Sequence, residues 1–146
     1  MFEPWSGAFR KLQPMEYAVI SAIKEISIGQ CENGREAYLA AYFTDGERGA
    51  AQGRPAQSIA GICAVKQALA ALCRSLCTEG IFREKAFEIV HTPDGAPRIG
   101  RFPDFSVGNR TYTKETFSIS ISHTRATAYG LAVVQERIDG RRTHPV

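Results

Sequence analysis

Apolar residues in the first half of the chain change from the spacing of a strand to that of a helix. The stretch "YAVISAIKEISI", residues 17–28, mixes alternation with β-branched residues, which predicts a strand. "REAYLAAYF", residues 35–43, has helical spacing, and the "TDGE" after it predicts a cap or turn before a short helix near residues 48–52. The chain is therefore expected to enter a sheet early and then form helices.

A longer apolar run predicts the main helix of the fold. Ser58 is a candidate N-cap, and the run continues to about Cys77. At 100° per residue, one arc collects the side chains that we expect to face the core, namely Ile59, Ile62, Val65, Leu69, Leu72, Cys73 and Leu76. Lys66 lies near the edge of this arc and Gln67 points almost the opposite way. The simplest interpretation of Lys66 is a stem packed on the core with its ammonium in water.

The second half of the chain has the pattern of strands joined by turns. "KAFEIVHT", residues 85–92, and "RIGRF", residues 98–102, flank a tight turn in which Gly95 is free to take a positive φ. A polar, turn-rich segment follows at residues 103–115. "FSISISHT", residues 117–124, alternates apolar residues with serine, and "AYGLAVVQE", residues 128–136, predicts a last, largely buried strand.

Composition indicates one ordinary globular domain. The 146 residues are 44% hydrophobic and 23% charged, which is enough to bury a continuous core. The net charge of +3 is too small, without a Lys/Arg run, to indicate a nucleic-acid partner. We see no signal peptide and no run that approaches the roughly 20 apolar residues of a membrane span, so we expect a cytoplasmic protein without a membrane partner.

Four cysteines and one histidine are the candidates for chemistry. Cys31, Cys63, Cys73 and Cys77 form no CxxC pair, so we expect buried free thiols rather than a metal site. His123 follows a strand end between Ser122 and Thr124, where it could bind phosphate or move a proton, or could simply cap a turn. Common catalytic and nucleotide-binding motifs are absent from the sequence.

The order of these segments resembles the holo-acyl-carrier-protein synthase type of the 4'-phosphopantetheinyl transferase superfamily. The resemblance is carried by "ISAIKEI", "FTDGE", "SIAGICAVKQAL", "FEIVHTPDGAPRI" and, most specifically, "FSISISHTRATAYGLAVVQE". It covers residues 17–137, which leaves residues 1–16 as an N-terminal extension and residues 138–146 as a flexible tail. The resemblance implies an α+β fold in which a long helix packs on an antiparallel sheet.

The resemblance also implies a function. Members of this family use magnesium to move phosphopantetheine from coenzyme A to a serine of an acyl carrier protein, and they usually form trimers with the site between subunits. It therefore implies coenzyme A or phosphopantetheine as the cofactor, an acyl carrier protein as the partner, a homotrimer, and a role in fatty-acid or polyketide biosynthesis.

Residue by residue, the family's metal ligands are missing from this chain. The pattern Gly-x-Asp-Ile-Val-Glu-Ile puts the magnesium-binding aspartate at Ala22, with the later glutamate at Glu25. The pattern Gly-Arg-Phe-Ala-x-Lys-Glu-Ala keeps Lys66 but puts the second metal-binding carboxylate at Gln67. A shift of alignment around Ala22 could bring Glu16 or Glu25 to the metal, whereas Gln67 is fixed in register by its neighbours.

Two basic residues of the family pattern are also replaced, at Ile62 and Ala71, while His123 and Thr124 of the closing motif are intact. The resemblance implies Lys66 and His123 as catalytic residues, and it implies that the cofactor is bound by Lys66, Ser122, His123, Thr124 and Gly95. No metal ligand is expected, and magnesium binding is doubtful because an amide and a methyl bring no charge.

Three functions remain open at this point. The first is a transferase-like protein with a degenerate active site that still recognises a carrier protein or its phosphopantetheine arm. The second is an active synthase with a modified metal site. The third is a structural paralogue that pairs with an active subunit. We expect the first, because losing two carboxylates and two basic residues removes the groups that stabilise transition-state charge.

Overall fold

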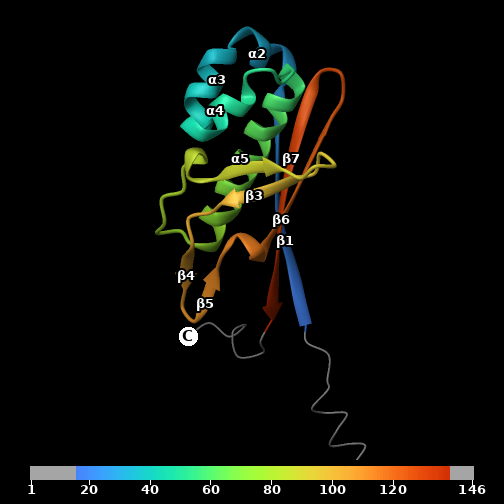
Figure 1. The fold of residues 1–146 in the computed structure, drawn as a ribbon. Coiled ribbons are helices and arrows are strands. Elements are labelled where there is room, and N and C mark those ends of the chain that lie inside the picture. The colour runs from blue at the N-terminus through green and yellow to red at the C-terminus, as the bar shows by residue number, and fades with distance from the viewer. Residues whose placement is uncertain (1–15, 139–146) are drawn as a thin grey trace, which may run out of the picture.

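A computed structural model describes residues 16–138 of the chain, with side chains through residue 136. Its centre is a three-stranded antiparallel sheet in the order β1-β7-β6 (Figure 1). The strands are β1 (Glu16–Ser27), β6 (Phe117–His123) and β7 (Thr127–Ile138). These bounds confirm the three strands expected from the sequence and the α+β class, because a single long helix packs on this sheet.

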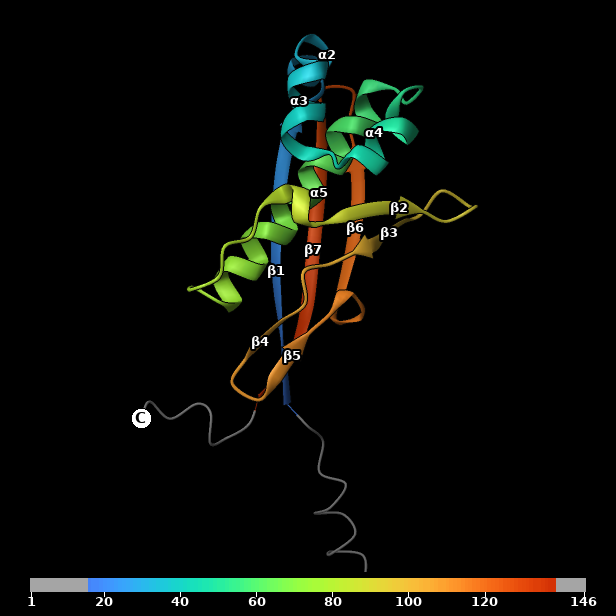
Figure 2. The same cartoon turned by 60° about the vertical axis from the view of Figure 1, so that its left-hand side comes forward.

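That helix, α5 (Ala56–Leu76), lies lengthwise over one face of the sheet and runs antiparallel to β1 (Figures 1 and 2). The approach is close because Gly130 of β7 has no side chain: a Cβ there would collide with the backbone of Ala64 and Val65. The N-cap is Pro55, so the expectation of Ser58 is wrong. The Ser58 hydroxyl instead accepts a hydrogen bond from Arg54 at 3.0 Å.

Three short helices join β1 to α5: α2 (Ile28–Asn33), α3 (Arg35–Tyr42) and α4 (Asp45–Ala51). The predicted helix at residues 35–43 is confirmed, and the short helix after it begins three residues earlier than expected. It does so because Thr44 and Glu47 form a capping box at its start. Helix α2 was not expected: Ile28, assigned to the strand by its branched side chain, follows Ser27, whose hydroxyl caps the helix.

Two small hairpins follow α5 in the chain. β2 (Glu88–His91) pairs with β3 (Pro97–Arg101), and β4 (Phe105–Val107) pairs with β5 (Arg110–Tyr112). Two 3-10 turns, η1 (Glu84–Ala86) and η2 (Lys114–Thr116), flank them. Gly95 has a φ of 92°, as expected for the turn between β2 and β3. The segment at residues 103–115 contains the second hairpin, which its many turn residues concealed.

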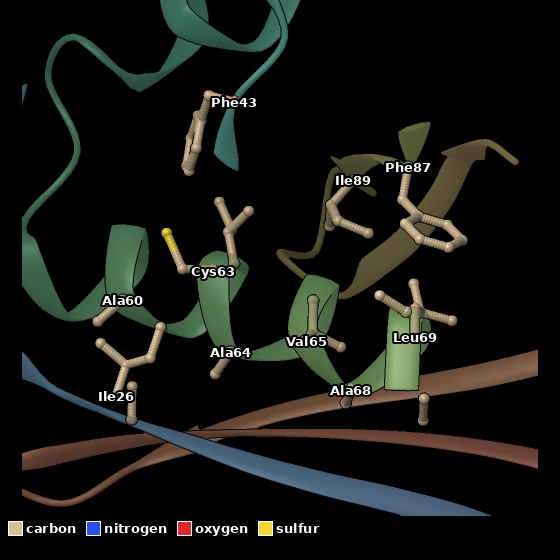
Figure 3. Close-up of a cluster of buried hydrophobic side chains, with 14 of the residues drawn as sticks. Ile26, Phe43, Ala60, Cys63, Ala64, Val65, Ala68, Leu69, Phe87 and Ile89 are labelled. Carbon is tan, nitrogen blue, oxygen red and sulfur yellow. The ribbon is translucent and has the colours of Figure 1, made fainter. Parts of the chain in front are cut away.

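The core surrounds α5 on nearly every side (Figure 3). Six of the seven residues expected in its apolar arc are buried, and Leu76 is half-buried. Cys31, Cys63 and Cys73 are buried and Cys77 is half-buried, all as free thiols, which confirms the interpretation of these cysteines as core. Burial raises the pKa of the Cys73 thiol to about 12, so it stays protonated at neutral pH.

By length and composition α5 could cross a membrane, since its mean hydropathy over the most apolar window is 1.4. The expectation that no run approaches membrane length is therefore wrong for this segment. In the structure 72% of that window is buried, which is what the core helix of a folded domain shows.

Candidate functional site

A groove of about 790 Å³ runs along the free edge of β6, the strand that pairs only with β7 in the sheet. Its walls come from β3, from η2 and from β6. Residues 96–99, Lys114, Glu115, Phe117 and residues 118–121 line it. The lining combines apolar side chains with the cations Arg98 and Lys114. The groove can therefore accept an extended ligand that carries both apolar and anionic parts.

Four of the predicted cofactor-binding residues are neighbours in sequence of residues that line this groove, although none of the four lines it. Gly95 directly precedes Ala96, and Ser122, His123 and Thr124 follow Ile121. The His123 side chain is exposed, with Nδ1 3.0 Å from the carbonyl oxygen of Thr124. The Thr124 hydroxyl accepts hydrogen bonds from the backbone of residues 126 and 127, which closes the β6–β7 turn.

Lys66, the fifth predicted binding residue, lies elsewhere. Its side chain is 0% exposed, forms an ion pair with Glu47 and donates a hydrogen bond to the Tyr42 carbonyl oxygen at 2.7 Å. The Nζ atom is 5.2 Å from the centre of the Phe43 ring, on the side of α5 away from the sheet (Figure 3). The interpretation of Lys66 as a side chain with its ammonium in water is therefore wrong, and α5 separates it from His123.

Glu47 explains why a lysine can be buried in this place. One of its carboxylate oxygens accepts from Lys66 and from the Thr44 amide, and the other accepts from the Ile89 amide at 2.7 Å. Burial lowers the pKa of Lys66, and the Glu47 carboxylate opposes that shift. Glu47 thereby joins α4, α5 and β2. The Thr-x-x-Glu spacing predicted its capping role, but no sequence pattern pairs it with Lys66.

The two positions aligned with the family's metal ligands have other partners. Ala22 packs against the core below α5, and Gln67 donates a hydrogen bond from Nε2 to the Tyr42 hydroxyl at 2.6 Å. Burial raises the pKa of Tyr42, while the hydrogen bond from Gln67 opposes the shift. Within residues 16–138, no group of three or more His, Cys, Asp or Glu side chains could hold a metal ion.

A contact between Arg54 and His91 that sequence reasoning missed lies beside the start of α5. Arg54 donates to Ser58 at 3.0 Å and contacts Nδ1 of His91 at 3.3 Å. Burial, and then the Arg54 charge, lower the pKa of His91, which favours a neutral imidazole that accepts from the guanidinium. Because Arg54 and His91 are 37 residues apart, no local pattern could have joined them.

No protein-family model matches the chain, and no curated protein matches it either. Solved structures do. A holo-(acyl-carrier-protein) synthase from Bacillus anthracis in complex with CoA (3',5'-ADP) is 20% identical, with 82% of this chain and 99% of that chain covered at a TM-score of 0.60. The Helicobacter pylori synthase in complex with coenzyme A is 23% identical. The alignment covers 79% of this chain and 99% of that chain at a TM-score of 0.55.

The acyl carrier protein synthase of Mycobacterium tuberculosis is 21% identical, and the alignment covers 83% of this chain and 100% of that one at a TM-score of 0.56. Identities of this size establish architecture, since the long helix, the antiparallel sheet and their connections match along nearly the full length of each neighbour. The chain therefore has the fold of the holo-acyl-carrier-protein synthases.

Proposed function

We propose that this protein is a phosphopantetheinyl transferase-like protein that binds the phosphopantetheine arm of coenzyme A or of an acyl carrier protein and lacks ordinary magnesium-dependent transferase activity. The observation that carries the proposal is the groove along β6. A phosphopantetheine arm is an extended chain with two amides and a terminal phosphate. The unpaired backbone groups of an edge strand can hydrogen-bond such amides, and Arg98 and Lys114 can neutralise the phosphate.

The predicted residues next to the groove in sequence support the same ligand. His123 presents an exposed imidazole, and Ser122 and Thr124 supply hydroxyls beside it. Gly95 in the β2–β3 turn has no side chain that could obstruct a ligand. We keep Lys66 as a residue implied by the resemblance, with the condition that its pair with Glu47 must open before any ligand can reach its ammonium.

The chain does not offer the ligands that magnesium requires. Mg²⁺ binds hard oxygens, usually one or two carboxylates with phosphate and water. Ala22 supplies none, and the Gln67 amide is uncharged and bonded to Tyr42. Glu25 does not replace them: it is three residues from Ala22, and because side chains alternate along a strand it lies on the opposite face of β1. Glu16 is six residues from Ala22, or about 20 Å along the strand, which is too far to replace it. An accessory or repurposed role in fatty-acid or polyketide biosynthesis fits this site.

We further propose a cytoplasmic homotrimer. The sheet face opposite α5 exposes Val19 at 70%, Ile23 at 63% and Tyr17 at 51% along β1. Contiguous exposed apolar side chains of this size mark an interaction surface, and further copies of the chain would cover it. Light scattering is expected to give three times the 16.0 kDa of one chain.

Acidic acyl carrier proteins are the proposed partner. Arg48, Arg54 and Arg74 are candidates for a complementary basic surface. Arg48 pairs with Glu36 and Arg74 donates to the Phe82 carbonyl oxygen, so each keeps only part of its donors for a partner. Binding is expected to be weak and micromolar, to survive a chelator, and to decline with salt because exposed charges are screened over about 10 Å at 0.1 M.

The experiment has two arms. Calorimetry with coenzyme A in excess EDTA is expected to show binding. Intact-mass spectrometry of apo carrier protein mixed with coenzyme A, magnesium and catalytic amounts of this protein is expected to show no useful conversion. Full conversion would establish the second candidate, an active holo-acyl-carrier-protein synthase, which the fold and the intact His123 and Thr124 of the closing motif favour. Absence of binding to both coenzyme A and carrier proteins would leave only the third function, a structural paralogue that pairs with an active subunit.

A further inference from the structure

We infer that Lys24 supplies a fixed positive charge at the junction of β1 and α5, where it holds the phosphate groups of a coenzyme A-type ligand without a metal ion. This inference rests on the proposed function, because it assumes that such a ligand binds. The junction is defined here by Ala22, Lys24 and Gln67. It lies beside α5 at the β1 edge of the sheet, whereas the groove lies along the opposite edge.

Strand alternation puts Lys24 on the face of β1 that α5 covers. Ile26 is buried and Ala22 packs against the core, and Lys24 lies between them with the same period of two. Its side chain is exposed because β1 is an edge strand beyond which no described strand pairs. Among the described residues Lys24 forms no ion pair and no side-chain hydrogen bond, so its ammonium is available to a ligand.

The contact at Gly130 fixes Lys24 relative to α5. Gly130 is the ladder partner of Lys24, and it lies directly against the peptide that joins Ala64 and Val65. Gln67 is two to three residues further along α5, or about 4 Å at 1.5 Å per residue. Since α5 runs antiparallel to β1 (Figures 1 and 2), Gln67 is level with the stretch of β1 between Lys24 and Ala22.

The direction of Gln67 around the helix agrees with this placement. Figure 3 shows Ala60 of α5 beside Ile26 of β1. Gln67 follows Ala60 by seven residues. Seven residues at about 100° each are about 20° short of two full turns, so the two side chains project toward the same flank of the helix. Lys24, Ala22 and Gln67 therefore share one junction.

The groups at this junction favour an anion over a divalent cation. Ala22 and Gln67 bring no negative charge, and Lys24 would repel a metal ion placed beside it. The Tyr42 hydroxyl accepts from Gln67 and keeps its own proton to donate. An ammonium and a neutral hydroxyl form a donor set suited to phosphate oxygens. The Glu84 carboxylate also acts on Tyr42, where its charge raises the pKa of the hydroxyl and so keeps it protonated.

The two halves of the proposed site lie on opposite edges of the sheet with α5 between them. A ligand in the groove of one copy would meet Lys24 directly if the β1 edge of the next copy lay against it. Closed head-to-tail rings join unlike edges in this way, so the proposed homotrimer would complete the site.

The test compares coenzyme A with pantetheine, which has the same arm and no phosphate. Calorimetry on the full chain in EDTA is expected to show coenzyme A affinity about 10–100-fold weaker for Lys24→Gln than for wild type, and unchanged pantetheine affinity, because only a phosphate contact is lost. Lys85→Ala, which removes an exposed cation from η1, serves as the matched control and is expected to change neither affinity.

Adding magnesium is expected to change the wild-type affinity for coenzyme A by no more than about twofold relative to the affinity in EDTA. Equal affinities of wild type and Lys24→Gln, or a more than tenfold gain on adding magnesium, would overturn the role of Lys24 while the proposed function stands. If wild type bound neither coenzyme A nor pantetheine, the proposed function itself would fail.

Discussion

Replacing Glu47 by glutamine is expected to lower the free energy of unfolding by about 3–5 kcal/mol, because it leaves the Lys66 ammonium buried without its counter-charge. The Lys66 side chain is 0% exposed and that of Glu47 is 8% exposed, so water cannot replace the lost carboxylate. In wild type the Glu47 carboxylate accepts hydrogen bonds from Lys66 and from the Thr44 and Ile89 backbone amides. The amide nitrogen of glutamine is a donor, so it would replace an acceptor and lose at least one of these hydrogen bonds.

Urea unfolding followed by circular dichroism measures this change at constant m-value. The control is the double variant Glu47→Gln/Lys66→Met, which removes the orphan charge and keeps the volume of the lysine stem. It is expected to be more stable than Glu47→Gln alone. A loss below about 1 kcal/mol for the single variant, or additive losses in the double, would refute the buried pair as a coupled unit.

The pH dependence gives an independent check. The pKa of Lys66 is lowered by burial and partly restored by Glu47, so removing Glu47 lowers it further. Between that folded pKa and the ordinary value near 10.5, the unfolded chain binds more protons, so stability rises with pH. The difference between wild type and Glu47→Gln is therefore expected to shrink from pH 7 toward pH 10.

Three further outcomes test other parts of the structure. Gly130→Ala is expected to destabilise the fold by about 1–3 kcal/mol or more because its Cβ meets the backbone of α5, whereas Gly49→Ala, which meets no atom within 4 Å, should be tolerated; equal stabilities would contradict the close packing. Magnesium titrated calorimetrically without nucleotide should show no binding to wild type, and the variant Ala22→Asp/Lys24→Val/Gln67→Glu should gain it; sub-millimolar one-site binding by wild type would show that other ligands exist. Because burial and Arg54 lower the pKa of His91, stability should fall as pH drops below about 6.5, and His91→Asn should reduce that fall relative to wild type in urea titrations. Parallel pH profiles of stability for wild type and His91→Asn would show that His91 does not cause the loss of stability at low pH.

Periodicity predicted the main elements because the same side chains that set the period are buried. The alternating segments 17–28 and 117–124 and the largely apolar segment 128–136 supply the three strands of the sheet, and the apolar arc of α5 faces the core. Helix α2 and the β4–β5 hairpin were missed, since short elements depend on caps and tertiary contacts. In the hairpin, the Phe105 and Tyr112 rings stack across the two strands with their centroids 4.8 Å apart, a contact that no local sequence pattern predicts.

The candidate site was predictable only in part for the same reason. Gly95, Ser122, His123 and Thr124 belong to a turn and a strand end, each of which adjoins in sequence residues that line one groove. The environment of Lys66 could not be predicted, because its partner Glu47 is 19 residues away and belongs to a different helix. Arg54 and His91 meet over a still longer separation. Local spacing carries no information on such pairs.

The central claim is that a phosphopantetheine ligand binds along β6 without magnesium. Heteronuclear NMR of the ¹⁵N-labelled protein, titrated with coenzyme A in excess EDTA, tests it most directly because each backbone amide reports its own surroundings. The account predicts saturable shifts concentrated at Gly95, Ala96 and the amides from Ser118 to Thr124, with Gly49 and Lys85 unmoved. An unchanged spectrum at saturating coenzyme A, or shifts confined to residues away from β6 and the β2–β3 turn, would contradict it.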